Sequence, residues 1–241
     1  MSQSHPSLRI RPRPQRGLFD HRRLMYGQSA LGAPLFYFPA DIRNEKTGLV
    51  IAGTHGDEVA AVVALSCALR TLEPGQLCHH VILAANPDGC QLGTRSNARG
   101  VDLNRNFKTG NWKSDGTVYR WNSAADERDV FLSTGSSAGS EPETRALCQL
   151  IQQLAPRWVT TIHEPLACIE DPLQSPLGHW LAEQLDLPLV SDVGYQTPGS
   201  FGTWCKENTF PCITVEFPPI SADTASEDYL SALMGLLIYP D

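Results

Sequence analysis

A histidine and a carboxylate, His55 and Glu58, stand where an apolar strand pattern changes into a helical one. The stretch LVIAGTHGDEVAAVVALSCALR (49–70) begins with the continuous branched apolar character of a buried strand and continues with helical spacing. Residues three apart at the start of a helix lie on the same side, so both side chains can point at one atom. Imidazole nitrogen and carboxylate oxygen are ligands that zinc prefers. The pair therefore indicates part of a metal site.

A catalytic zinc takes three protein ligands, so a third must come from elsewhere in the chain. His163 is the best candidate because it ends the run RWVTTIH, which predicts a strand beside the first. The other histidines lie in the N-terminal segment, at the start of a strand or on a predicted helix: His5, His21, His79, His80 and His179. An H-x-x-E pattern also arises by chance, and the helix dipole alone attracts acidic residues to a helix N-terminus. The motif by itself leaves that alternative open.

Two further stretches contain charged residues that could bind a substrate or take part in catalysis. NPDGCQLGTRSNARGVDLNRNF (86–107) places Arg95, Arg99 and Arg105 close together, and guanidinium groups bind carboxylates and oxyanions; a solvated loop is the alternative. CITVEFPP places Glu216 in an otherwise apolar strand, where an unpaired carboxylate costs stability. Burial raises the pKa of a carboxyl group toward the range that a general base needs. We therefore predict a catalytic role for Glu216.

A regular scaffold is expected to position these residues. Apolar runs predict strands at 35–38, 48–53, 80–85, 158–163, 187–191 and 212–217, and helical spacing predicts helices at 58–70, 141–154, 177–185 and 225–238. This alternation predicts an α/β fold with a mixed, largely parallel central sheet and helices on both faces. Ligands of such sheets bind beyond the carboxyl ends of strands, where His55, His163 and Glu216 fall. We expect one domain over residues 1–241, with an irregular N-terminal segment at 1–30.

Composition narrows the class of protein. The chain has 241 residues and a net charge of -7, which argues against a nucleic-acid partner. No apolar run approaches the ~20 residues of a membrane helix, and the basic N-terminal segment lacks the apolar region of a secretory signal. The seven cysteines are odd in number and form no C-x-x-C pair, which favours a reducing compartment. We expect a cytoplasmic protein with no membrane partner, and its oligomeric state cannot be deduced from the sequence.

Taken in order, the motifs resemble the zinc carboxypeptidases. H-x-x-E is followed by N-P-D-G, T-R-S, D-L-N-R-N-F, a histidine at a strand end, Y-Q-x-x-G-S and T-V-E-F, over residues 48–217. The resemblance implies the fold of that family and one zinc ion per chain, held by His55, Glu58 and His163. It also implies that Glu216 is the general base and acid, which activates water and then protonates the leaving amine.

The same resemblance implies roles for the residues around the metal. Asp102 would orient the first histidine ligand, a role with a clear physical reason because a hydrogen-bonded imidazole is held in one tautomer. Arg95 would stabilise the oxyanion of the tetrahedral intermediate. Asn104 and Arg105 would hold the terminal carboxylate of the substrate. Tyr195 would close over the bound substrate.

The context of these motifs is most similar to a bacterial branch of the family that acts on cell-wall peptides. It implies hydrolysis of the γ-D-glutamyl–meso-diaminopimelate bond of murein tripeptide, a small peptide substrate, in cell-wall recycling. We expect the residue that selects the far end of diaminopimelate in the loop 108–137 or in the segment 164–171.

Three alternatives remain to be weighed against this interpretation. An N-acyl amino acid deacylase of the aspartoacylase or succinylglutamate desuccinylase type shares H-G-x-E and D-L-N-R, but N-P-D-G, Y-Q-T-P-G-S and T-V-E-F-P favour the peptidase. A muropeptide-binding protein without activity would not require Glu216. A structural zinc site would favour a cysteine-rich tetrad, and no cysteine cluster accompanies His55.

Overall fold

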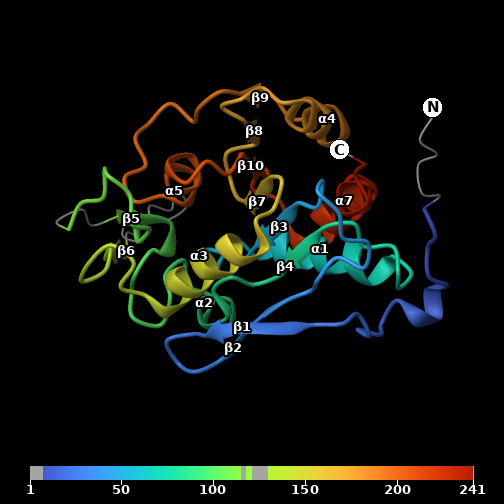
Figure 1. The fold of residues 1–241 in the computed structure, drawn as a ribbon, viewed down its shortest axis with the longest axis horizontal. Coiled ribbons are helices and arrows are strands. Elements are labelled where there is room, and N and C mark those ends of the chain that lie inside the picture. Colours follow the sequence, from blue (N-terminus) through green and yellow to red (C-terminus); the bar gives the residue numbers. More distant parts are fainter. Residues whose placement is uncertain (1–7, 115–117, 121–129, 241) are drawn as a thin grey trace.

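A six-stranded sheet forms the centre of the computed structural model, which describes residues 8–114, 118–120 and 130–240 (Figure 1). Every neighbouring pair is parallel except one, which confirms the predicted mixed, largely parallel sheet. The antiparallel pair is formed by the fourth and fifth strands in the sheet order. In that order the strands are β4 (His80–Ile82), β3 (Leu49–Ala52), β7 (Val159–His163), β10 (Cys212–Glu216), β8 (Cys168–Glu170) and β9 (Leu189–Val190).

Helices cover both faces of the sheet, as the sequence predicts, because alternate side chains of each strand point to opposite sides. Val50 and Ala52 of β3 contribute to one apolar cluster, together with side chains of α1 (Val59–Thr71), α4 (Pro176–Leu185), α6 (Ala222–Asp228) and α7 (Leu230–Leu237). Leu49 and Ile51 contribute to the other, with side chains of α3 (Pro142–Leu154) and α5 (Phe201–Glu207). Strand β3 is therefore packed between two apolar cores, which fix the position at which the following segment starts.

The N-terminal part of the chain is more regular than expected. Within the segment 1–30, predicted to be irregular, lie the short helix η1 (Arg13–Gln15) and strand β1 (Leu24–Gln28), which pairs with β2 (Pro34–Tyr37) in an antiparallel hairpin. Phe38, just after β2, exchanges two backbone hydrogen bonds with Val81 of 2.8 and 2.9 Å, so the hairpin protects the exposed edge of β4. Strand β1 forms because it pairs with β2, and its own residue types do not predict a strand.

The polar region 86–139 contains elements that hydrophobic spacing did not predict. Helix α2 (Pro87–Leu92) begins where the Asn86 side chain accepts a 2.9 Å hydrogen bond from the backbone N–H of Gly89. A short helix, η2 (Leu103–Arg105), and the strands β5 (Val118–Arg120) and β6 (Val130–Leu132) follow. Residues 115–117 and 121–129 of the loop 108–137 lie outside the described residues.

The helix predicted at 225–238 is two helices rather than one. Helix α6 starts earlier because the Ser221 hydroxyl accepts a 3.1 Å hydrogen bond from the backbone N–H of Thr224 and so caps its first turn. The chain leaves the regular helix at Tyr229 before α7 begins. Among the described residues, no helix has both the length and the hydropathy needed to span a membrane.

Candidate active site

Three neighbouring strands bring the predicted site residues to one edge of the sheet. His163 is the last residue of β7 and Glu216 the last of β10, and the two are register partners in this parallel pair. His55 and Glu58 lie between β3, on the other side of β7, and α1, after a turn at Gly53 with a φ of 65°. The carboxyl ends of parallel strands meet at the same edge, so residues more than a hundred positions apart become neighbours.

The three predicted metal ligands converge. His55 Nδ1 lies 2.6 Å from one carboxylate oxygen of Glu58, and His163 Nδ1 lies 2.8 Å from the other. The two Nδ1 atoms are 3.2 Å apart, and all three side chains are buried. One ligand atom from each of the three residues lies within 4.8 Å of the other two. The arrangement places two nitrogens and a carboxylate around a single point.

The hydrogen-bond partners of the two imidazoles are consistent with a cation bound between their Nδ1 atoms and Glu58. His55 Nε2 lies 3.1 Å from Asp102 Oδ1, and His163 Nε2 lies 3.1 Å from Thr161 Oγ1, so each outer nitrogen has an oxygen that can accept its proton. An uncharged imidazole whose outer nitrogen carries the proton directs the lone pair of Nδ1 inward, where Glu58 also presents only acceptors. Lone pairs that face one another repel unless a proton or a cation lies between them. The donor set therefore fits a metal ion, and a nitrogen–carboxylate set of this kind suits zinc.

Two carboxylates of the site, Glu58 and Asp102, have pKa values below their usual range. Burial by itself raises the pKa of Glu58. The neighbouring His55 and His163 have a larger effect in the opposite direction, so the net pKa lies well below its usual range. Burial also raises the pKa of Asp102, and the charges of His55 and Arg95 outweigh it, so its net pKa is likewise lowered. Both carboxylates are thus held ionised, and Arg95 forms an ion pair with each of them.

Asp102 connects several of the predicted residues through one carboxylate that is 0% exposed. Besides His55, its Oδ1 accepts a 2.8 Å hydrogen bond from the backbone N–H of Asn104, and its Oδ2 accepts one of 3.3 Å from Arg95 Nε. Arg95 also donates from Nη1 to Glu58 at 3.0 Å. Asp102 therefore fixes the positions of His55, Arg95 and the start of η2 relative to one another.

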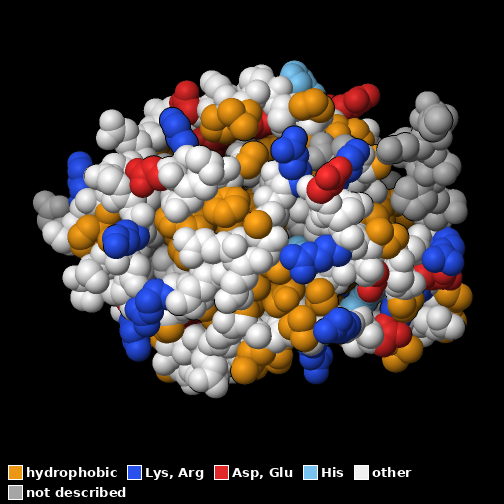
Figure 2. All heavy atoms as spheres, in the orientation of Figure 1, with side chains coloured by type: hydrophobic (Ala, Val, Ile, Leu, Met, Phe, Trp, Pro, Cys, Tyr) orange, Lys and Arg blue, Asp and Glu red, His pale blue; other side chains and the backbone are white. Residues whose placement is uncertain are grey.

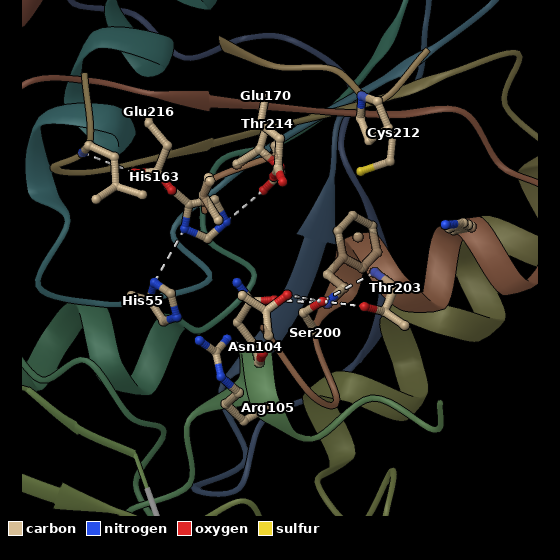
Figure 3. A pocket seen from close by; sticks show the side chains of 18 of the residues that line it. His55, Asn104, Arg105, His163, Glu170, Ser200, Thr203, Cys212, Thr214 and Glu216 are labelled. Carbon is tan, nitrogen blue, oxygen red and sulfur yellow. Dashed lines mark hydrogen bonds between the residues drawn. The ribbon is translucent and has the colours of Figure 1, made fainter. Parts of the chain in front are cut away.

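The predicted substrate-binding residues line the same cavity, which has a volume of about 500 Å³. Asn104 Oδ1 accepts a 2.8 Å hydrogen bond from the backbone N–H of Phe201, and Arg105 Nη1 donates to the backbone carbonyl of Asn104 at 2.8 Å. Arg105 is buried, whereas Tyr195, between β9 and α5, is 57% exposed. Figure 3 shows Asn104 and Arg105 across the cavity from Glu216.

Glu216, which the sequence predicts to be the general base, lines this cavity beside the candidate metal ligands. One carboxylate oxygen accepts a long hydrogen bond of 3.4 Å from the backbone N–H of Leu166. Burial raises the pKa of Glu216, His163 partly opposes this shift, and the nearby Glu58 carboxylate adds to it. A carboxyl group with a raised pKa is better suited to take up and return a proton near neutral pH.

Other polar residues of the cavity were not singled out from the sequence: Glu170, the last residue of β8, Thr214 in β10 and Lys206 in α5. Thr214 was detectable, because it alternates with Cys212 and Glu216 on one face of a strand. The segment 164–171 was expected to contain a selecting residue, but Glu170 could not be distinguished within it. Its position depends on β8, which is too short for its pattern to predict a strand.

Comparison with known proteins identifies the family. Residues 20–165 match the family model described as zinc carboxypeptidase. The chain belongs to the zinc carboxypeptidase family. Among its relatives, murein peptide amidase A of Escherichia coli (strain K12) is 63% identical over 227 residues, which cover 94% of each chain. Murein peptide amidase A of Vibrio campbellii is 54% identical over 226 residues, covering 94% of this chain and 91% of that one.

Solved structures agree with this membership of the zinc carboxypeptidase family. The crystal structure of murein-tripeptide amidase from Escherichia coli O157 has a TM-score of 0.93 and 61% identity, and the match covers 96% of this chain and 98% of that one. Thrombin activatable fibrinolysis inhibitor has a TM-score of 0.68 at 15% identity, over 90% of this chain and 70% of that one, and shows the shared fold alone. The chain is therefore a hydrolase of a zinc-dependent family, and His55, Glu58 and His163 form its candidate metal site.

Proposed function

We propose that the protein is a zinc-dependent amidase that hydrolyses the γ-D-glutamyl–meso-diaminopimelate bond of murein tripeptide during cell-wall recycling. One observation carries the proposal: the convergent ligands His55, Glu58 and His163 share a cavity with Glu216 and Arg105. The support for the substrate is the 63% identity to murein peptide amidase A over 94% of the chain. One zinc ion per chain would be held by the three ligands.

The chain's own residues would then perform the proton transfers. When bound, zinc would polarise the scissile carbonyl and lower the pKa of the attacking water. Glu216 accepts a proton from that water and returns it to the amine that leaves. Arg95 already donates to Glu58. It is also placed to donate to the negative charge that develops on the carbonyl oxygen when the water attacks.

The substrate's carboxylate is the second group that the cavity must hold. Diaminopimelate carries a carboxylate on the carbon next to the scissile amide nitrogen. Arg105 can bind it with two parallel hydrogen bonds, and Asn104 can add an amide donor. Tyr195 lies on the cavity with much of its side chain in solvent, so it is free to close over a bound peptide.

The setting proposed for this activity is a single domain in the cytoplasm with a small peptide as its partner. Both apolar clusters pack on the same sheet, which supports one domain. All seven cysteines are free, which supports a reducing compartment. Figure 2 shows one face of the molecule, on which the Lys and Arg side chains are scattered rather than gathered into a stripe. This distribution supports the absence of a nucleic-acid partner.

The test is hydrolysis of L-Ala-γ-D-Glu-meso-diaminopimelate by the purified protein, followed by mass spectrometry. We expect release of free diaminopimelate, its loss after treatment with a chelator and its return when zinc is added back. N-acetylaspartate and N-succinylglutamate serve as substrates for the deacylase alternative. Intact tripeptide in the presence of zinc-loaded protein would overturn the proposed substrate, and cleavage of an acylated amino acid instead would favour the deacylase.

A further inference from the structure

Four glutamates are found among the described residues that line the cavity, and three of them have a use. Glu58 lies between the two histidine ligands, and Glu216 is the proposed base. Glu164 accepts a 3.0 Å hydrogen bond from the backbone N–H of Ala61 and thereby holds the first turn of α1. Glu170 takes no part in these arrangements.

We propose that Glu170 binds the ammonium group at the far end of the leaving amino acid's side chain and so selects diaminopimelate. The inference rests on the proposed function and adds to it the residue that determines specificity. Glu170 would act by contact with the substrate, without a part in the proton transfers.

The sheet places Glu170 on the same wall as Glu216. Strands β8 and β10 are antiparallel, with Glu170 opposite Thr214 and Cys168 opposite Glu216. Directly opposed residues of such a pair point to the same face. In β10 the residues Thr214 and Glu216 face the cavity, whereas Val215 packs in the core on the other side. Figure 3 shows Glu170 and Thr214 together at the side of the cavity that also carries Glu216.

The spacing along this wall fits the length of the ligand. From Glu216 to the level of Thr214 is a two-residue step, which spans about 6.8 Å in an antiparallel strand. Five bonds separate the Cα atom of diaminopimelate from its far amino nitrogen, and an extended chain of that length spans about 6 Å. When the scissile nitrogen lies beside Glu216, the far ammonium group therefore reaches the level of Glu170.

The charge of Glu170 also suits a cationic ligand. Its carboxylate accepts a hydrogen bond from the Thr214 side chain, yet no lysine or arginine forms an ion pair with it in the part of the chain that the structure describes. Burial raises the pKa of Glu170, and the nearby Asp192 adds to the shift. A half-buried carboxylate without a cationic partner gains a charge-assisted hydrogen bond when an ammonium group arrives.

The decisive experiment compares two tripeptides that differ only in the far amino group. Both begin with L-Ala-γ-D-Glu; one ends in meso-diaminopimelate and the other in 2-aminopimelate, which lacks that amino group. For Glu170→Gln we expect kcat/KM to fall roughly 10- to 100-fold with diaminopimelate, mainly through KM, and to change little with aminopimelate. Glu183→Gln, which alters an exposed glutamate of α4 outside the cavity, should leave both values unchanged.

Each result is decisive. An equal loss with both peptides would assign Glu170 a structural role and overturn the inference, as would unchanged kcat/KM with diaminopimelate. If Glu170→Gln does not fold, the wild-type enzyme alone decides, because it must prefer diaminopimelate over aminopimelate by about the same factor. If zinc-loaded wild-type enzyme cleaves neither peptide, the proposed function fails and the inference fails with it. A wild-type enzyme that cleaves both equally removes the inference alone.

Discussion

Replacing Asp102 with asparagine should weaken zinc binding roughly 10- to 100-fold although all three ligands remain. Asp102 is not one of the three candidate ligands; it accepts a hydrogen bond from His55 Nε2 at 3.1 Å, which holds the imidazole with Nδ1 directed at the candidate metal site. The substitution keeps the size and shape of the side chain and removes its charge. A change in zinc affinity would therefore report on the orientation and basicity of the ligand.

The magnitude follows from the three hydrogen bonds that Asp102 accepts. An asparagine can keep His55 Nε2 and the backbone N–H of Asn104 on its single oxygen, but its amino group then faces Arg95 Nε, where an oxygen stood at 3.3 Å. Loss of one charge-assisted hydrogen bond costs about 1.5–3 kcal/mol of protein stability. Arg95 retains Glu58, so the protein should still fold. The expected loss in zinc affinity corresponds to about 1.4–2.7 kcal/mol.

The assay is a competition titration of metal-free protein with zinc and a chromophoric chelator. Thermal unfolding with and without zinc separates a loss of stability from a loss of affinity, because a ligand stabilises only the folded state that binds it. Asp88→Asn is the matched control: Asp88 is also buried and accepts from Ser29 Oγ at 2.7 Å and from the backbone N–H of Leu31 at 2.9 Å, away from the cavity. Wild-type zinc affinity in Asp102→Asn, or an equal loss in the control, would refute the reasoning.

Three further predictions concern other residues. Glu216→Gln should keep its zinc and lose roughly 10²- to 10⁴-fold in kcat, because the amide cannot accept the proton of the attacking water. His163→Ala removes one of three ligands, so zinc content after dialysis, measured by elemental analysis, should fall far below that of the wild type. Burial lowers the pKa of His79 from 6.5 to about 4, although its ring donates to the Tyr239 carbonyl. The unfolded chain therefore takes up a proton first, and stability should fall by about 3 kcal/mol as pH drops from 6.5 to 4. His79→Gln should remove that part of the pH dependence in urea unfolding.

Each of these has a result that contradicts it. Near-normal turnover by Glu216→Gln would remove this residue from the mechanism. A full zinc complement in His163→Ala would mean that another side chain is the third ligand, and His179→Ala, at an exposed histidine, provides the comparison. If His79→Gln loses as much stability as the wild type between pH 6.5 and 4, the acid sensitivity arises elsewhere.

The parts of the fold that were predicted correctly are those with a local signal. The run at 49–52 is apolar at every position and fully buried, and such a run reads as a strand covered on both faces whatever its neighbours are. Helix α3 has a polar and an apolar face, with Leu147 and Ile151 buried four residues apart, and was predicted within one residue. These signals depend on the residue types of a single segment.

The missed elements are short or depend on distant partners. Strand β8 has three residues, too few for a periodic pattern, and it is a strand because β10 and β9 pair with it. Helix α5 has seven residues and begins directly after Ser200, whose side chain accepts a hydrogen bond from the backbone N–H of Thr203. That capping serine is a start signal that could have been noticed. For β8 the sequence offers no equivalent signal.

By itself, the sequence was enough to predict a hydrolase of the zinc carboxypeptidase family. The residue types at three strand ends, together with the order of the motifs, indicate that family, and the role of Glu216 as the base remains a prediction. Tertiary structure decided the geometry: Glu58 and His163 are 105 residues apart and come within 2.8 Å because β3, β7 and β10 are neighbours. The place of Glu170 opposite Thr214 depends in the same way on an antiparallel pairing. Strand order and register are set by the packing of helices from distant segments on both faces of the sheet, and no single segment contains that information.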